Sequence, residues 1–188
     1  MGNGESSYHR FLNGDKSAFS EIIDIYRKNL IFFINRYLNN LSLSEELAED
    51  CFVELIVHPH RFNFKNSLKT YLFTIARNKA VDLIRKNRLS MPDGEELLLN
   101  ASEDYVEFEE EIFKSEEKKL LHSSMHKLIS DYRTALHLIY FEDMSYEMAG
   151  KVMKKNKKQM ENIVYRAKIA LRTVLEKEGY KYEGKICF

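Results

Sequence analysis

Residues 18–38 read AFSEIIDIYRKNLIFFINRYL, and the apolar side chains in this stretch recur every three or four positions. The positions that follow this spacing are Phe19, Ile22, Ile23, Tyr26, Leu30, Phe33, Ile34 and Tyr37. That spacing places them along one face of a helix of about six turns. Because such a stripe must be buried against other elements, the stretch predicts a helical bundle.

Two further helical patterns follow this stretch. Ser42 and Glu45 form a capping-box pattern for a second helix, which is expected to end at Pro59. After a loop at residues 58–67, a third helix is expected over residues 68–88. No strand-like alternation interrupts these patterns, so the first 89 residues are predicted to form an all-α bundle.

The charges are unevenly distributed along the chain, although its 29 basic and 29 acidic residues cancel. Residues 1–89 carry a net charge of +3, residues 90–118 carry −9, and residues 119–188 carry +6. This arrangement is typical of two modules that face nucleic acid across an acidic connector, although ordinary solvated surfaces would give the same balance. Pro92 and Gly94 interrupt the acidic stretch, so we expect a linker there.

The last third of the chain contains two helical patterns joined by a tight turn. Ser145 is placed to cap the first, and Asn156 with Gln159 gives a capping box for the second, which continues through Leu175. Such a pair predicts a helix-turn-helix, although any two-helix hairpin has the same pattern. An earlier helix is expected to have as its inner residues Leu128, Ile129, Tyr132, Ala135, Leu136 and Ile139.

Five lysines crowd this turn and the start of the last helix. They are Lys151, Lys154, Lys155, Lys157 and Lys158. A helix N-terminus already carries a partial positive charge, so each cation there is disfavoured by up to ~1 kcal/mol. An anionic ligand such as a phosphate backbone would reverse that cost, whereas a merely solvated basic turn would not need one.

A second basic surface is expected between residues 61 and 88, where Asp82 is the single acidic residue. The basic residues are Arg61, Lys65, Lys69, Arg77, Lys79, Arg85, Lys86 and Arg88. The aromatic residues interleaved with them are Phe62, Phe64, Tyr71 and Phe73. Cations that follow phosphates beside rings that stack on bases are typical of single-strand binding, although these rings could equally fill the core.

Nothing in the sequence indicates catalysis. His122 and His126 have the spacing of metal ligands on one helix face, but no third ligand is nearby, so neither a metal nor a cofactor is expected. Asp50 and Glu54 lie one turn apart, as paired catalytic carboxylates can, yet on a bundle surface such pairs are usually solvated or face a partner. Glycine-rich phosphate loops and nucleophile elbows are missing from the sequence, and we expect no enzyme.

Three features bear on where the protein acts. Cys51 and Cys187 are too few for a disulfide framework. The longest apolar run, residues 30–34, is too short to cross a bilayer, and the chain does not begin with a secretory signal. The sequence therefore predicts a cytoplasmic protein with no membrane insertion.

Three short stretches carry a resemblance to a known family. Residues 48–54 read AEDCFVE, residues 68–82 read LKTYLFTIARNKAVD, and residues 165–172 read YRAKIALR. They resemble, in this order, three motifs of the extracytoplasmic-function (ECF) group of bacterial sigma-70-type initiation factors. The motifs are an Ala-Glu-Asp helix, a Trp-Leu-x-x-Ile-Ala-Arg-Asn-x-x-x-Asp signature, and the end of a DNA-recognition helix. Tyr71 stands where the signature has tryptophan.

The resemblance covers residues 10–88 and 116–176 and implies a specific architecture. It implies an all-α protein of two small helical domains, a sigma region 2 bundle and a sigma region 4 helix-turn-helix, joined by an acidic linker. The implied divisions are residues 1–89 for region 2, 90–115 for the linker, 116–178 for region 4 and 179–188 for a C-terminal tail.

The resemblance also implies a function in transcription initiation. The first domain would bind core RNA polymerase at its beta-prime clamp and would melt the promoter's minus-ten element. The second would read the minus-thirty-five element of promoter DNA. The beta flap of core polymerase is a further expected contact, and an anti-sigma factor is a further partner that the family allows. The alternatives are a stand-alone helix-turn-helix regulator and an enzyme with a DNA-binding tail.

Candidate contact residues follow from the resemblance together with the helical positions. The candidates for core polymerase are Glu49, Asp50, Phe52, Val53 and Glu54, with Asp50, Phe52 and Glu54 expected outward and Leu47, Cys51 and Leu55 inward. Those for the minus-ten element are Arg61, Phe62, Asn63, Phe64, Lys65, Asn66, Lys69, Tyr71, Arg77 and Asn78. Those for the minus-thirty-five element are Lys154, Lys155, Lys157, Lys158, Gln159, Glu161, Asn162, Tyr165, Arg166 and Lys168, with Met160, Ile163, Val164 and Ala167 expected inward.

The sequence departs from the family pattern at several positions. Val53 replaces a common glutamine, so one polar contact to polymerase is expected to be lost. Gly150 stands in an alanine position, and Lys154 and Lys155 replace the turn glycine and an apolar residue. Because glycine inside a helix costs up to ~1 kcal/mol, we expect this helix-turn-helix to be less rigid than others of its kind.

Overall fold

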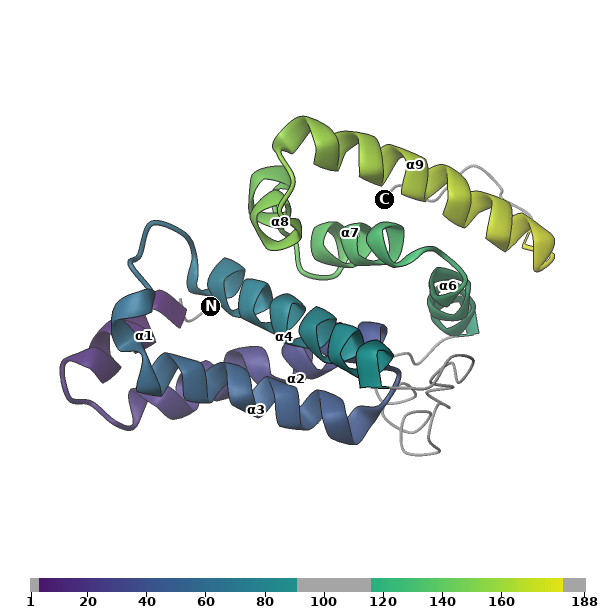
Figure 1. Ribbon diagram of the computed structural model, residues 1–188. Helices are drawn as coiled ribbons and strands as arrows, with labels where there is room; N and C mark the ends of the chain where they lie inside the picture. The colour runs from purple at the N-terminus through teal and green to yellow at the C-terminus, as the bar shows by residue number, and fades with distance from the viewer. Residues whose placement is uncertain (1–3, 91–115, 181–188) are drawn as a thin grey trace. The chain divides into compact units, whose positions relative to one another are not determined.

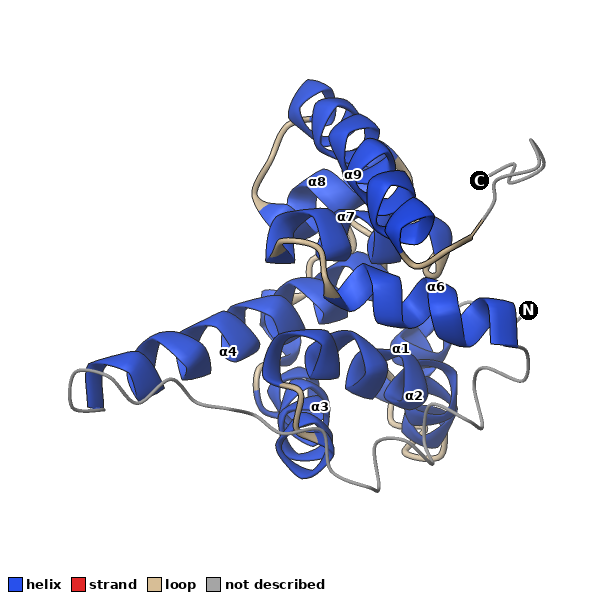
Figure 2. Cartoon of the chain, turned by 90° about the vertical axis from the view of Figure 1, so that its right-hand side faces the viewer, coloured by secondary structure: helices blue, strands red, loops and turns tan. Residues whose placement is uncertain are grey.

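The computed structural model describes residues 4–90 and 116–180, and the chain divides into two compact units, one holding each of these ranges (Figure 1). Within these ranges the regular secondary structure is entirely helical, as Figure 2 shows. The expected acidic linker and C-terminal tail lie largely outside the described residues. None of the described helices is long and apolar enough to span a bilayer.

The first unit is built around α2 (Ala18–Leu38), which packs against α1 (Gly4–Leu12), α3 (Leu41–Val57) and α4 (Leu68–Ser90). The predicted stripe of α2 supplies its core, including the fully buried Ile22, Leu30, Phe33 and Ile34. A short 3-10 helix, η1 (Pro59–Arg61), follows α3 and leads into the loop before α4. The sequence patterns therefore predict α2, α3 and α4 but leave out α1.

The start of α3 differs from the prediction. Asn39 ends α2 in the left-handed backbone region (φ 49°), and Asn40 at once caps α3 by accepting a hydrogen bond from the Leu43 backbone N–H at 3.0 Å. The predicted capping box at Ser42 and Glu45 is therefore wrong, because the turn between the helices is two residues shorter than that pattern required. Asparagine suits both positions, since it tolerates the left-handed region and caps helices well.

The second unit contains α6 (Glu116–His126), α7 (Ser130–Tyr140), α8 (Tyr146–Met153) and α9 (Lys157–Lys177). The other three helices pack against α9. The core side chains include Met125, Leu136, Leu138, Val152, Met160, Val164 and Leu171. The prediction that Ile129 is an inner residue is wrong: α7 begins after it, and its side chain is 62% exposed.

Candidate nucleic-acid and polymerase interface

The outward face of α3 carries the two carboxylates predicted to bind polymerase. Asp50 is exposed and accepts a hydrogen bond from Lys79 of α4 at 2.9 Å. Glu54, one turn later, is half-buried and bonds to Arg61 of η1. Both carboxylates are therefore paired with cations of the neighbouring basic surface, and ion pairs at the protein surface contribute about 0–1 kcal/mol each.

The prediction that Phe52 lies on this outward face is wrong. Its side chain is 4% exposed and lies edge-on to Phe19 of α2, with 6.4 Å between ring centroids. Cys51 and Leu55 are buried as predicted, and Leu47 is half-buried. The buried stripe of α3 includes position 52 because α2 packs against α3 and places Phe19 against this ring.

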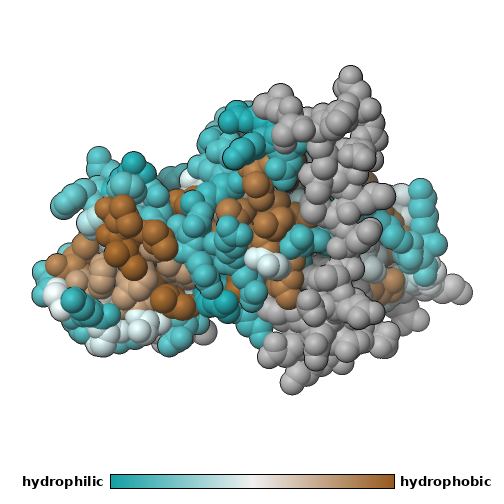
Figure 3. Space-filling model, turned by 60° about the horizontal axis from the view of Figure 1, so that its bottom comes forward, coloured by the Kyte–Doolittle hydropathy of each residue, from teal (hydrophilic) through white to brown (hydrophobic). Residues whose placement is uncertain are grey.

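Three apolar side chains remain exposed on α3 beside the carboxylates. They are Val53, Ile56 and Val57, which are spaced three and four positions apart and so share one face. Figure 3 brings forward the side on which α3 lies and shows brown apolar surface among the hydrophilic side chains. Val53 is among the predicted contact residues, whereas Ile56 and Val57 are not, although their spacing from Val53 is visible in the sequence. Exposed apolar side chains that cluster in this way mark an interaction surface.

Phe62, predicted to contact an unstacked base, is instead a core residue. Its side chain is 4% exposed, and its ring lies among those of Tyr8 (centroids 5.6 Å apart), Phe64 (4.6 Å) and Tyr71 (5.3 Å). The loop folds back because α1 supplies Tyr8 as a partner for this ring. Phe62 therefore packs beneath the loop in the core of the first unit and does not present a ring face to solvent.

The other residues of this loop are displayed at the surface. Phe64 is 38% exposed and adopts the left-handed backbone region (φ 58°). Asn63, Lys65 and Asn66 are exposed around it, and the Asn63 side chain accepts a hydrogen bond from the Lys65 backbone N–H at 3.1 Å. The surface at this loop is thus one aromatic ring surrounded by amide and ammonium groups.

The candidates on α4 are less accessible than those on the loop. Lys69, Tyr71, Arg77 and Asn78 are all half-buried. Lys69 lies with its ammonium 5.8 Å from the centre of the Phe73 ring. Burial, and to a smaller extent the charge of Glu54, raises the pKa of Tyr71 above its usual range.

The helix-turn-helix is confirmed as α8, a turn at residues 154–156, and α9. The Ser145 hydroxyl caps α8 by accepting from the Met148 N–H at 3.2 Å. Asn156 and Gln159 form the predicted capping box, with two hydrogen bonds of 2.9 Å each. Local side chains therefore fix both helix starts of the motif.

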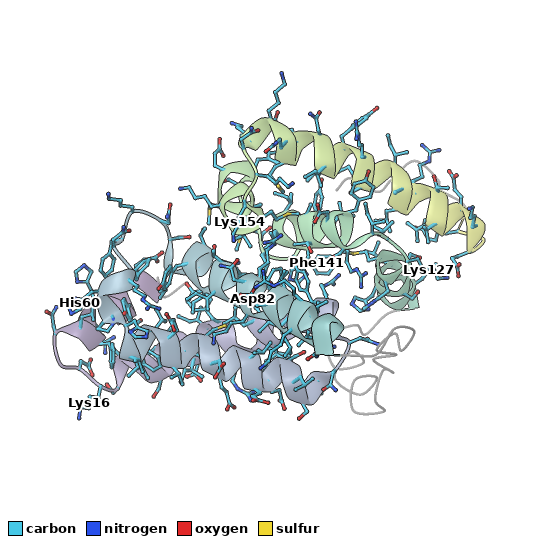
Figure 4. The ribbon with its side chains drawn as sticks, in the orientation of Figure 1. Lys16, His60, Asp82, Lys127, Phe141 and Lys154 are labelled. Atoms are coloured by element: carbon cyan, nitrogen blue, oxygen red, sulfur yellow. The ribbon has the colours of Figure 1, made fainter. Side chains whose placement is uncertain are left out.

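The turn explains one departure from the family pattern, Gly150, and shows the backbone strain that another, Lys154, introduces. Lys154, labelled in Figure 4, adopts the left-handed region (φ 56°) that a glycine would enter without strain. The next residue, Lys155, donates its N–H to the Gly150 carbonyl at 2.8 Å, so the chain folds tightly onto α8. A Cβ atom on Gly150 would lie 2.5 Å from the Lys155 carbonyl oxygen. Glycine is therefore required at 150 by this close approach.

The exposed face of α9 agrees with the sequence prediction. Met160, Val164 and Ala167 are buried and Ile163 is half-buried. The exposed candidates are Lys154, Lys155, Lys157, Lys158, Gln159, Glu161, Asn162, Tyr165 and Arg166. Ile169, one turn beyond Tyr165, is also exposed and continues the same face, although it is not among the predicted contact residues.

Three candidates on or near this face already have partners. The Gln159 side-chain oxygen is used in the capping box. Lys157 donates to Glu147 at the start of α8 at 2.7 Å, which lowers the pKa of that carboxyl and raises the pKa of the lysine. Lys168 is half-buried with its ammonium 5.0 Å from the centre of the Tyr140 ring, so it lies toward α7.

No metal centre is formed by the side chains that the structure describes. His122 and His126 lie with their rings 4.6 Å apart, but no group of three histidine, cysteine or acidic side chains comes together in residues 4–90 or 116–180. Cys51 is buried, which raises the pKa of its thiol to about 12, and it donates to the Leu47 carbonyl. That thiol therefore acts as a small core group.

Comparison with known proteins gives a consistent result. A model of the sigma-70 region 2 family matches residues 22–89. The ECF RNA polymerase sigma factor SigW of Bacillus subtilis is 26% identical over 170 residues, which cover 86% of this chain and 91% of that protein. SigM of the same organism is 24% identical over 157 residues, which cover 84% of this chain and 94% of SigM.

Two solved structures share the fold. The sigma factor RpoE of Bartonella quintana, in complex with the anti-sigma factor NepR, has a TM-score of 0.67 at 21% identity over 84% of this chain and 96% of RpoE. CnrH, in complex with the cytosolic domain of CnrY, has a TM-score of 0.68 at 18% identity over 94% of this chain and 99% of CnrH.

The helical bundle, the helix-turn-helix and these relatives together define a class, the non-enzymatic initiation factors of bacterial transcription. Within that class, the chain belongs to the ECF group of the sigma-70 family. It is a sigma factor that directs RNA polymerase to promoters.

Proposed function

We propose that the first unit joins polymerase to the minus-ten element and that the second reads the minus-thirty-five element. The observation that carries this proposal is that one small helical unit displays two unlike surfaces. The α3 face combines carboxylates with an exposed apolar stripe, whereas the loop before α4 combines cations, amides and one exposed ring. A protein partner suits the first surface and a single strand of DNA suits the second.

Core polymerase would bind the α3 face. Asp50 and Glu54 supply charge, and Val53, Ile56 and Val57 supply apolar area beside them. Cations on the polymerase clamp would replace Lys79 and Arg61 as partners of the two carboxylates. Exchange of one weak surface ion pair for another changes the free energy of binding little. Burial of the apolar stripe then supplies most of the favourable free energy of binding.

The minus-ten element would bind the loop around Phe64. Extraction of a base from the DNA stack costs a few kcal/mol, which a ring that stacks on the extracted base offsets. Asn63 and Asn66 offer amide groups to the base edges, and Lys65 offers an ammonium to phosphate. Arg77 and Asn78 on α4 would extend this surface along the strand.

The minus-thirty-five element would bind α9, inserted into the major groove with its N-terminus first. Asn162 and Arg166 are exposed and suit adenine and guanine edges, and Glu161 suits the cytosine amino group. Lys154 and Lys155 lie in the turn and Lys158 at the start of α9, where they would hold phosphates without reading the sequence. Substitutions of the base-contacting residues should therefore change promoter specificity, whereas substitutions of the lysines should change affinity for all promoters.

Polymerase binding, which we expect to take place in the cytoplasm, is tested by mixing the protein with core RNA polymerase. We expect the wild-type chain to co-purify with core polymerase and to support run-off transcription. The double variant Asp50→Lys/Glu54→Lys should lose both, because it reverses the charge of the α3 face. The matched control Asp24→Lys/Glu46→Lys changes the net charge equally at two exposed positions outside the candidate set and should retain both.

Two results would contradict this assignment. The α3 face is not the docking surface if the double variant assembles holoenzyme as well as the control does. The chain is a stand-alone regulator if it binds promoter duplex with sequence specificity in the absence of polymerase and never enters a complex with it.

The test of promoter reading compares α9 variants in the holoenzyme. Alanine at Asn162 or Arg166 should change the preferred base at one minus-thirty-five position, with a loss of about 1–3 kcal/mol on the original promoter. Alanine at Lys158 should weaken all promoters alike and should reduce the salt dependence of binding by about one unit. A uniform loss for all three variants would mean that α9 does not read bases.

A further inference from the structure

Helix α1 contacts the segment that leads into the loop at residues 62–67, the loop itself, and the first residue of α4 after it. Figure 1 shows α1 beside η1 and the chain that leads into α4. Three side chains of one short helix make these contacts: Glu5, Tyr8 and His9. Their targets are far from α1 in sequence, so the shape of the loop depends on the packing of this helix.

Tyr8 holds the beginning of the loop. Its side chain is fully buried, and its hydroxyl donates to the Leu55 carbonyl at 3.0 Å and lies 3.5 Å from the Pro59 carbonyl. Burial, and to a smaller extent Tyr71, raises the pKa of Tyr8 to about 12, so the hydroxyl remains a donor even in moderately alkaline solution. The end of α3 and the start of η1 are therefore fixed to α1.

Glu5 holds the end of the loop. Its carboxylate accepts a hydrogen bond from the Leu68 backbone N–H, the first of α4, at 2.6 Å. The Ser67 hydroxyl accepts from the Thr70 N–H at 3.1 Å and so satisfies a second free donor of the same helix end. A carboxylate at a helix N-terminus is favoured by charge as well as by hydrogen bonding. Glu5 thus acts as a distant cap that fixes where α4 begins.

His9 holds the middle of the loop. Its ring stacks on the Phe64 ring with 4.5 Å between centroids and 24° between planes. Phe64 is the loop residue in the left-handed backbone region, which residues with a side chain avoid unless their surroundings hold them there. The His9 ring and the Asn63 side chain, bonded to the Lys65 N–H, supply that support.

We infer that α1 is the positioning element of the base-binding loop and that Glu5, Tyr8 and His9 are its positioning residues. This inference rests on the proposed capture of a minus-ten base at Phe64. A loop already held in its bound shape loses less conformational freedom when it receives the base than a free loop would. The three contacts should therefore accelerate promoter opening beyond any effect on the stability of the fold.

The structure offers matched controls on the same helix. The Ser7 hydroxyl donates to a Glu21 carboxylate oxygen at 2.7 Å, and Arg10 donates to the same carboxylate at 2.9 Å. These bonds join α1 to α2 and do not touch the loop. Substitution of Ser7 or Arg10 by alanine therefore weakens the attachment of α1 while leaving its contacts to the loop in place.

The experiment measures open-complex formation by holoenzyme on a duplex promoter and on the same promoter with a pre-melted bubble. Tyr8→Phe removes one hydroxyl and keeps the ring, Glu5→Ala removes the distant cap, and His9→Ala removes the stack. Each should slow opening of the duplex by roughly three- to tenfold, the equivalent of one lost hydrogen bond or ring contact, and should change the rate on the bubble by less than about twofold. Glu5→Gln, which keeps an acceptor oxygen, should restore most of the rate on duplex.

The controls and the parent proposal give distinct outcomes. Ser7→Ala and Arg10→Ala should leave the ratio of the two rates unchanged even where they lower the melting temperature as much as Tyr8→Phe does. The inference is wrong, and α1 is only structural, if the variants at Glu5, Tyr8 and His9 slow opening of both templates equally. It is also wrong if the Ser7 and Arg10 controls change the ratio of the duplex rate to the bubble rate as much as those variants do. If Phe64→Ala itself leaves the ratio unchanged, the proposed base capture fails instead.

Discussion

The loop at residues 62–67 and the turn at residues 154–156 each hold one residue in the left-handed backbone region, but different contacts stabilise them. Each contains a residue with a side chain in the left-handed region, Phe64 at φ 58° and Lys154 at φ 56°. The turn is held by its immediate neighbours: Gly150 accepts from Lys155, and Asn156 caps the next helix.

The loop, in contrast, is held by side chains from α1. Tyr8 and His9 lie more than fifty positions earlier in the chain than the loop residues that they contact. A turn held locally keeps its shape whatever the rest of its unit does, whereas a loop held from a distance depends on the whole unit. We expect the variants below to separate these two kinds of support.

The largest expected effect is on the stability of the first unit, when the side-chain packing between α1 and the loop is removed. Phe62→Ala removes a buried ring that contacts Tyr8, Phe64 and Tyr71, and should destabilise the first unit by about 3–5 kcal/mol. Hydrogen exchange should show the loss in α1 through α4 and leave α8 and α9 unchanged. Phe64→Ala, at an exposed position two residues later, should cost less than about 1 kcal/mol. Similar losses for the two variants would contradict the assignment of Phe62 to the core.

The next largest effect is on the stability of the second unit, when the close contact between Gly150 and the turn is disturbed. Gly150→Ala places a Cβ atom 2.5 Å from the Lys155 carbonyl oxygen and should destabilise the second unit by about 1–3 kcal/mol, although alanine is the better helix former. Chemical denaturation of the full chain, followed by exchange at α8 and α9, measures this. An unchanged or raised stability would mean that the turn relaxes freely, and the required close approach would be refuted.

A smaller change in stability distinguishes Lys154 from Phe64, the two residues in the left-handed backbone region. Lys154→Gly relieves backbone strain and loses only an exposed side chain, so it should stabilise the second unit by about 1 kcal/mol. Phe64→Gly relieves the same strain but loses the ring that contacts His9 and Phe62, so it should give no net gain. The comparison fails if thermal melting shows an equal gain for both.

The smallest effect appears in alkaline solution. Burial raises the pKa of both Tyr8 and Tyr26 from 10.0 to about 12, so the folded first unit holds these protons more tightly than the unfolded chain. Their contribution to stability is fully present below pH 10 and is lost as the pH rises toward 12. Tyr8→Phe should make the fall in melting temperature between pH 10 and 12 shallower, whereas Lys154→Gly should not change it.

The same contrast explains which features the sequence predicted. The caps at Ser145 and Asn156 and the exposed face of α9 were predictable because each depends on residues within one or two helical turns. Phe52 and Phe62 were assigned to the surface because their burial depends on α1 and α2, whose packing no local pattern reveals. Position 5 shows the limit most clearly, since a carboxylate that caps α4 leaves no signal near α4 itself.

The central claim is that Phe64, held by α1, receives an unstacked base of the minus-ten element. It is tested most directly by the rate of open-complex formation for wild-type and Phe64→Ala holoenzymes on duplex and pre-melted templates of one promoter. Loss of one base-stacking contact should slow the duplex reaction by about tenfold or more and leave the pre-melted reaction within about twofold of wild type. An equal loss on both templates, or no loss on either, would contradict the account.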